Sequence, residues 1–211
     1  MKLATVIIPH HNAHDQLKDL LACLDNKLFD INICSGNACA YNYNKGAKIA
    51  ETDKMIFCND DILPTNENFE KICVTLDSFD IVGASQISLK NNEKYYGIFI
   101  ELQRTGVYKP TVQTRPKCSF FPHGFCFGIK KHTWNQLGGF NEKFLTGYED
   151  VDFGIRAVQL GATMALLDLE IKHVEAASEG RFEHINHNIK MLNDLYPQSF
   201  LRAFAEQAPK I

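Results

Sequence analysis

Long apolar runs are missing from this sequence. No stretch reaches the length of about 18 apolar residues that a membrane-crossing helix needs. The first twelve residues, MKLATVIIPHHN, turn polar after a short apolar run and lack the form of a signal peptide. We therefore expect a cytoplasmic location and no transmembrane segment, and the abrupt end at Ile211 leaves room for further domains in a longer chain.

An excess of basic residues is also missing. The chain has 22 Lys plus Arg against 25 Asp plus Glu, with a formal net charge of -3. Proteins that bind nucleic acid neutralise backbone phosphates with clustered Lys and Arg. We therefore expect no nucleic-acid partner.

Paired cysteine motifs are absent as well. The seven cysteines are an odd number, form no C-x-x-C pair, and mostly lie within apolar runs. This usage is typical of buried free thiols in a reducing compartment. We expect neither a disulfide framework nor a zinc cluster.

Short apolar runs alternate with segments of helical spacing in the first 84 residues. Strands are predicted at 4–8, 31–34, 55–58 and 81–84, and helices at 14–24, 41–50 and 66–76. At 211 residues and 45% hydrophobic content, the chain is long enough for one sizeable core. The pattern predicts a single α/β domain with a mainly parallel sheet, whose ligands bind at the carboxyl ends of the strands. The polar loops 9–12, 35–37 and 59–61 should line that rim.

The second half of the chain has a different pattern. Longer strands are predicted at 95–102 and 118–129, as an inserted or antiparallel part of the same sheet. Helices are predicted at 131–137, 150–160 and 182–195, with a last short helix after Pro197. Phe121, Phe125 and Phe127 are expected in the core, while Trp134 is the better candidate for a surface sugar platform.

Adjacent acids follow the third predicted strand. In Phe57-Cys58-Asn59-Asp60-Asp61-Ile62, an apolar strand ends in two carboxylates at the predicted ligand-binding rim. Hard oxygen ligands on a loop suit Mg²⁺ or Mn²⁺, which keep positions open for substrate phosphates. An acid pair after a strand is also common in turns and helix caps, and that alternative stays open.

Two later patterns add titratable groups. Glu149, Asp150 and Asp152 precede or begin an amphipathic helix, where acids also serve as caps and favour the helix dipole. His173 follows a strand-like segment, and a single histidine in such a place is often structural.

Taken together and in order, these segments resemble the family-two glycosyltransferases of GT-A fold. The matching segments are Thr5 to Pro9 with Asn12, Asn44-Lys45-Gly46, Asn59-Asp60-Asp61, Gly124 with Gly138-Gly139-Phe140-Asn141-Glu142, Glu149 to Asp152, and His173 with Ser178 and Gly180. The resemblance covers about residues 3 to 181. Agreement of several weak motifs in one order is more specific than any one of them. The short core, rich in lysine and asparagine, would also fit a viral or bacterial surface-glycan enzyme.

The resemblance implies one GT-A domain over 1–211, with a nucleotide-binding half at about 1–90 and an acceptor-binding half at about 91–211. It implies an inverting transfer of a hexose or deoxyhexose from a nucleoside-diphosphate sugar, UDP above all, to a hydroxyl of a glycan acceptor. Mn²⁺ or Mg²⁺ would bind Asp61, helped by His173, with Asp60 or Asn59 assisting through water. Asp150 would be the catalytic base and Glu149 would touch the acceptor. The residues expected around the base and ribose are Pro9, His10, Asn12, Ser35, Asn37 and Asn44.

The chain departs from the family pattern at two places. Asn59 stands where the Asp-x-Asp region usually begins with Asp, which places more weight on Asp61. Cys34-Ser35-Gly36-Asn37 lacks the acid that often follows the second strand and contacts the nucleoside. The identity of the base is therefore less well defined than the fold.

Two other functions remain open. A sugar-phosphate nucleotidyltransferase would use a similar sheet, but its usual Gly-rich, basic loop is missing, because Pro9-His10-His11-Asn12 contains no Gly, Lys or Arg. A non-catalytic module that binds nucleotide or carbohydrate would use the acids only as caps.

Overall fold

The computed structural model describes residues 1–10, 16–36, 38–174 and 184–211. The strands in these ranges are β1 Ala4–His10, β2 Phe29–Ser35, β3 Lys54–Cys58, β4 Ile62–Leu63, β5 Ile81–Ser88, β6 Lys94–Tyr95, β7 Gly97–Leu102, β8 Tyr108–Gln113, β9 Phe121–Pro122, β10 Cys126–Lys130 and β11 Met164–His173. The helices are α1 Gln16–Cys23, α2 Cys39–Lys48, α3 Asn66–Thr75, α4 Lys131–Leu137, α5 Glu149–Leu160, α6 Ile185–Leu195 and α7 Gln198–Gln207. None of these helices is long and apolar enough to cross a membrane.

The central sheet is mixed, as predicted. Its strand order is β2-β1-β3-β10-β5-β11-β4, with β6 paired to β5. The pairings make β1, β2, β3, β5 and β11 run in one direction, while β10, β4 and β6 run in the other. The carboxyl ends of the five parallel strands therefore share one edge of the sheet, and the chain segment that enters β10 lies at that same edge.

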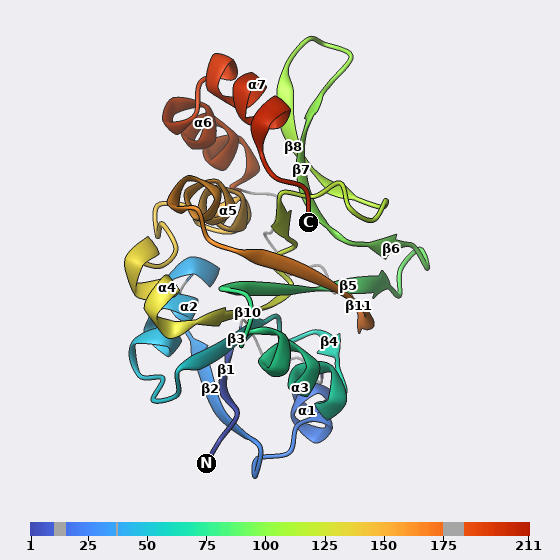
Figure 1. Cartoon of the computed structure of the whole chain (residues 1–211), viewed down its shortest axis with the longest axis vertical. Helices are drawn as coiled ribbons and strands as arrows, with labels where there is room; N and C mark the ends of the chain where they lie inside the picture. The colour runs from blue at the N-terminus through green and yellow to red at the C-terminus, as the bar shows by residue number, and fades with distance from the viewer. Residues whose placement is uncertain (11–15, 37, 175–183) are drawn as a thin grey trace.

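Helices cover both faces of this sheet, because the strands alternate apolar side chains between the faces. On β1, Val6 and Ile8 pack with residues of α1 and α3 in one core cluster, whereas Ile7 packs with α2, α4 and α5 in the other. Figure 1 shows the resulting three layers, with α1 and α3 on one side and α2, α4 and α5 on the other. The prediction of an α/β domain is confirmed.

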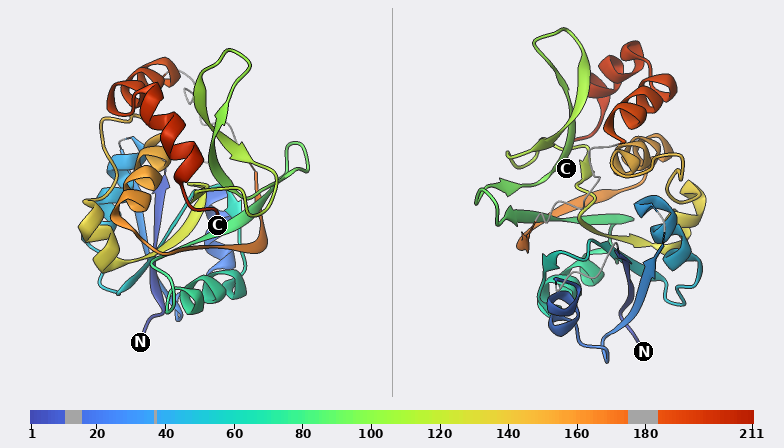
Figure 2. Two further views of the ribbon diagram at one scale, coloured as in Figure 1. Left: turned by 45° about the horizontal axis from the view of Figure 1, so that its top comes forward. Right: turned by 180° about the vertical axis from the view of Figure 1, so that it is seen from behind.

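The predicted strand at 118–129 is interrupted and serves two sheets. β9 pairs with β7 in a second sheet of order β8-β7-β9, and β10 pairs with β3 and β5 in the central sheet. The residues between them, His123 to Phe125, belong to neither strand and lie at the edge where the parallel strands end. The expectation that 95–102 belongs to the central sheet was wrong for Gly97–Leu102, since β7 runs in the second sheet, against which α7 packs (Figure 2). Tyr95, the last residue of β6, does pair with β5 in the central sheet.

The larger core cluster is rich in aromatic rings. Phe121, Phe125 and Phe127 are buried, as predicted. Trp134 is only 6% exposed and its ring stacks on Phe57 at 4.4 Å between ring centroids. The prediction of a surface platform at Trp134 was therefore wrong, because α4 turns this face toward the sheet and the indole fills the space between α4, β3 and α5.

Candidate active site

Two acid–histidine pairs lie where the parallel strands end. Asp60 Oδ2 is 2.7 Å from Nδ1 of His10, the last residue of β1. Asp61 Oδ1 is 2.9 Å from Nε2 of His173, the last residue of β11. The Asp61 carboxylate and the His173 ring are mostly buried. Residues separated by 112 positions in the sequence thus meet because their strands end at the same edge.

Contacts with Gln86 and Phe125 fix the orientation of the His173 ring. Its Nδ1 lies 2.7 Å from Oε1 of the buried Gln86, and its ring stacks on Phe125 at 5.5 Å between centroids. A carbonyl oxygen can only accept, so Nδ1 carries the proton in this contact. In a neutral imidazole the lone pair is then on Nε2 and faces the Asp61 carboxylate, so the two acceptors need a proton or a cation between them.

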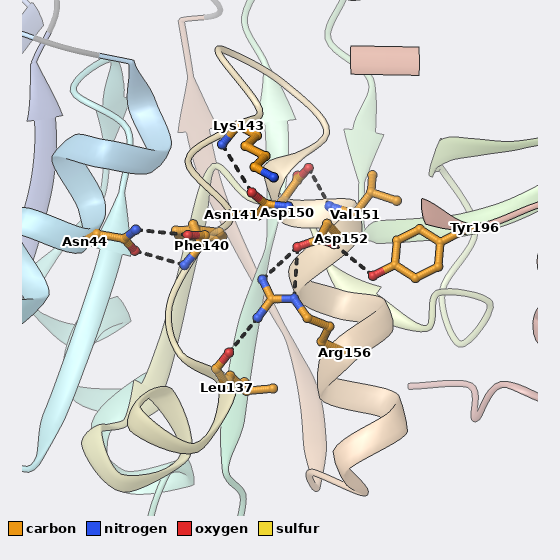
Figure 3. A network of polar contacts seen from close by, with 10 residues as sticks. All are labelled: Asn44, Leu137, Phe140, Asn141, Lys143, Asp150, Val151, Asp152, Arg156 and Tyr196. Carbon is orange, nitrogen blue, oxygen red and sulfur yellow. Dashed lines mark hydrogen bonds and ion pairs between the residues drawn. The ribbon is translucent and has the colours of Figure 1, made fainter. Parts of the chain in front are cut away.

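Asp150 lies at the start of α5 and is held by backbone N–H groups. Its Oδ2 accepts a hydrogen bond from Gly124 N at 3.0 Å, and its Oδ1 accepts one from Val151 N at 2.9 Å. Gly124 belongs to the segment that enters β10, and Phe125 in the same segment stacks on His173. Asp150 therefore lies at the same edge as the Asp61–His173 pair. Figure 3 shows Asp150 at the first turn of α5.

Space between Gly124 and Asp150 is tight. A methyl group at position 124 would lie 2.6 Å from Asp150 Oδ2 and 2.8 Å from Asp150 Cβ. Only glycine allows the backbone to approach the carboxylate this closely. The sequence therefore needs Gly124 for the position of Asp150.

Cys39, the first residue of α2, lies among the carboxylates of both groups. Burial and the nearby charges of Glu149, Asp150 and Asp60 raise the pKa of the Cys39 thiol well above its usual value, and its side chain is hydrogen-bonded to Glu149. Burial together with Cys126, Asp60 and Asp61 likewise raises the pKa of Cys58. Negative charge is therefore concentrated at this edge, which favours the approach of a cation.

The remaining residues expected at the nucleotide fall into three groups. Pro9 is buried in β1, and Ser35 is exposed at the end of β2 beside His10. Asn59 Oδ1 accepts a hydrogen bond from the Tyr43 hydroxyl at 3.2 Å. Asn12 and Asn37, like Ser178 and Gly180 of the late motif, lie outside the described residues.

Asn44 has contacts that differ from those expected of a nucleotide ligand. Its Oδ1 accepts a hydrogen bond from Phe140 N at 2.9 Å, while its Nδ2 donates to Phe140 O and to Glu142 Oε1. The carboxamide is thus engaged with the loop that follows α4 (Figure 3). These contacts fix the loop, and a role of Asn44 at the nucleotide stays a prediction.

A model of the family described as "Glycosyltransferase like family 2" matches residues 6–183. The chain belongs to this glycosyltransferase family. A comparison with curated protein sequences found no match.

Two solved structures share the GT-A fold of this glycosyltransferase. One is Staphylococcus aureus TarS 1-349, with a TM-score of 0.59 and 14% identity, covering 97% of this chain and 69% of that one. The other is GalNAc-T7 with UDP, GalNAc and Mn²⁺, with a TM-score of 0.64 and 11% identity, covering 93% of this chain and 48% of that one. Because both identities are low, the likeness to these two structures shows the fold alone.

The glycosyltransferase site also contains residues that sequence reasoning missed. Gln86 contacts His173, and Cys39 contacts Glu149. For Gly124, only its contact with Asp150 was missed. Gln86 had one detectable signal, because Ser85-Gln86 places polar side chains inside an otherwise apolar strand. Cys39 had none, since its contact depends on how α2 meets α5. Gly124 is part of the family resemblance, but its contact with Asp150 could not be read from the sequence, because it depends on how the β10 segment meets α5.

Proposed function

We propose that this glycosyltransferase moves a hexose or deoxyhexose from UDP to a hydroxyl of a glycan acceptor, with inversion at the anomeric carbon. The observation that carries the proposal is that the Asp61–His173 pair and Asp150 lie at one edge of the sheet, where ligands bind in open α/β folds. Membership of a glycosyltransferase family supports the reaction class.

The residues at this edge fit a divalent cation. Within the described ranges no three His, Cys, Asp or Glu side chains form a metal cage, but Mg²⁺ and Mn²⁺ commonly bind one or two protein ligands together with substrate phosphates. Asp61 and His173 would hold the ion, with Asp60 or Asn59 assisting through water. Gln86 orients the His173 ring so that Nε2 faces the Asp61 carboxylate. A cation bound between these two acceptor atoms would be coordinated by both of them.

Such an ion, when bound, supplies positive charge that stabilises the leaving diphosphate. GalNAc-T7, which shares the fold, was solved with UDP and Mn²⁺, and this supports the choice of nucleotide and metal. His10 would contact the nucleoside through Nε2, because its Nδ1 is paired with Asp60. Pro9 and Ser35 lie beside His10 at the same strand ends, and we add Asn12 and Asn37 to this proposed nucleoside site.

Asp150 acts as the general base. Its carboxylate takes the proton of the acceptor hydroxyl as that oxygen bonds to the anomeric carbon and the bond from carbon to the diphosphate oxygen breaks. A single displacement of this kind inverts the anomeric configuration. The N–H groups of Gly124 and Val151 hold the carboxylate in place, and Glu149, beside Cys39, is the residue proposed to touch the acceptor.

A panel of nucleotide sugars tests this function. The wild-type chain is incubated with UDP-, GDP- and CMP-sugars, with Mn²⁺ or with EDTA, and the released nucleotide is measured. We expect release from a UDP-sugar only, only with the metal, and not from Asp150→Asn. Metal-dependent UDP binding without release from any sugar, in the presence of glycan acceptors, would instead favour a binding module.

A further inference from the structure

The segment before Asp150 is held by a helix that lies beyond the family match. The family model ends at residue 183, and α6 and α7 follow it. We infer that α6 and its C-terminal end are part of the catalytic apparatus, with Asn188 and Tyr196 as positioning residues for Asp150. The inference rests on the proposed role of Asp150 as the base.

Asn188 binds the backbone of three consecutive residues. Its Nδ2 donates to Thr146 O at 2.8 Å and to Gly147 O at 2.9 Å, and its Oδ1 accepts from Leu145 N at 3.4 Å. The side chain is completely buried, and its donors and acceptor all serve this loop. Buried amide groups of this kind are costly to leave unpaired, so the loop has one strongly preferred position against α6.

The loop leads directly into α5. Gly147 and Tyr148 both have positive φ, 89° and 71°, and Glu149 is the first residue of the helix. A non-glycine residue at positive φ is unfavourable by about 1 kcal/mol or more and persists only where the surroundings fix it. Asn188 supplies such contacts on the residues immediately before Tyr148, three to five positions before Asp150.

Tyr196, at the end of α6, holds the first turn of α5 from its inner face. Its hydroxyl donates to Asp152 Oδ1 at 2.8 Å, and Asp152, only 2% exposed, also accepts from Nε and Nη2 of Arg156 through Oδ2. Burial and the Asp152 charge raise the pKa of Tyr196, so the phenol stays a donor. Figure 3 shows Tyr196, Asp152 and Arg156 in one line of contacts beside Asp150.

The same loop is fixed at its other end by Asn44, whose carboxamide binds Phe140 and Glu142. Two asparagines, one from α2 and one from α6, therefore bind the stretch between α4 and α5 at both ends. A base must be placed to within a fraction of an ångström, and an error of about 1 Å lowers rates by up to ~100-fold. The contacts of Asn188 and Tyr196 are thus expected to act on turnover and not on donor binding, which takes place at the strand ends.

Asn188→Ala tests the inference, with Asn193→Ala, an exposed residue of the same helix, as the matched control. We expect Asn188→Ala to bind UDP with Mn²⁺ within about twofold of wild type and to release nucleotide about 10- to 100-fold more slowly. Hydrogen–deuterium exchange of amides 145–151 should become at least about tenfold faster. Asn193→Ala should change none of these quantities.

Tyr196→Phe provides a second variant in case Asn188→Ala does not fold. It removes one hydroxyl and keeps the ring that packs on Phe200, so we expect about a fivefold loss of turnover and faster exchange at the start of α5. Unchanged exchange over 145–151 in both variants would overturn the inference, and so would a loss of UDP affinity as large as the loss of turnover. If the wild-type chain releases no nucleotide, the proposed function fails, whereas the exchange rates still decide whether α6 holds this segment.

Discussion

The two groups of site residues are held in different ways. Asp60, Asp61, His10 and His173 lie at or directly after strand ends, so the pairing of the central sheet sets their positions. Asp150 lies on a helix, and its position depends on Gly124, on the loop before it and on residues of α6. The sheet therefore positions the strand-end residues of the site, whereas three separate segments of the chain position Asp150.

This difference predicts different sensitivities. Substitutions of supporting residues around the strand ends should leave the strand ends in place, because backbone pairing remains when a side chain is lost. Their effect should be limited to the one side chain that the lost residue orients. Substitutions around Asp150 should cost more in turnover than in stability, because few contacts determine where its carboxylate lies.

Replacement of the proposed base has the largest expected effect. Asp150→Asn removes the proton acceptor and keeps the shape, so we expect kcat to fall by about 10²- to 10⁴-fold with UDP affinity nearly unchanged. Steady-state kinetics with the active UDP-sugar and calorimetric titration of UDP measure the two quantities. Asp194→Asn, on the exposed side of α6, is the control and should behave as wild type. Equal kcat in wild type and Asp150→Asn would remove Asp150 from the mechanism.

Gly124→Ala has the next largest expected effect. The added methyl group would overlap the Asp150 carboxylate and displace it, so we expect a loss of kcat of about 10- to 100-fold. Gly106→Ala is a useful control, because the new methyl group would meet nothing within 4 Å, although φ is +78° there. That control should lower stability and leave kcat unchanged. Full activity of Gly124→Ala would mean that Asp150 tolerates displacement.

Gln86→Met tests how the proposed metal ligand His173 is oriented. Loss of the carboxamide removes the contact that directs Nε2 of His173 toward Asp61, so we expect the Mn²⁺ concentration needed for UDP binding to rise about 10- to 100-fold. Gln103→Met, in the turn between β7 and β8, serves as the control. An unchanged Mn²⁺ requirement in Gln86→Met would show that the His173 ring needs no support from β5.

Tyr43→Phe has the smallest expected effect. It removes the hydrogen bond to Asn59 at the end of β3, while the sheet still holds the strand, so we expect a loss of about 1 kcal/mol in the free energy of unfolding. Urea denaturation measures this loss, and Tyr41→Phe, exposed on the same helix, should cost almost nothing. A large fall in kcat for Tyr43→Phe would contradict the claim that the sheet alone places the strand ends.

Sequence reasoning predicted most of the strands and helices that carry the sheet-borne residues. Apart from the two-residue strand β4, the order of strands and helices up to Ala84 follows from apolar periodicity. The acids after β3 are visible as polar residues that directly follow an apolar strand. The pairing of Asp61 with His173 follows once both strands are known to end at one edge. The strands, the helices and the acids are local sequence patterns, and the rule that parallel strands end at one edge of a sheet relates their positions.

Other features depend on packing that no local pattern encodes. The interruption between Pro122 and Cys126 arises because β9 and β10 join different sheets, so the strand predicted over 118–129 is not continuous. Trp134 was placed on the surface although α4 buries it against Phe57. The contacts of Asn188 and Asn44 join helices to a loop far away in the sequence, and neither asparagine lies in a pattern that reveals its partner.

The central claim is that Asp61 and His173 hold a divalent ion that binds the donor diphosphate. Calorimetric titration of UDP into wild type and Asp61→Ala, each with and without Mn²⁺, tests it most directly. We predict binding to wild type only with Mn²⁺, and a loss of this binding in Asp61→Ala with folding intact by circular dichroism. UDP binding that is equally strong without Mn²⁺, or in Asp61→Ala, would contradict it.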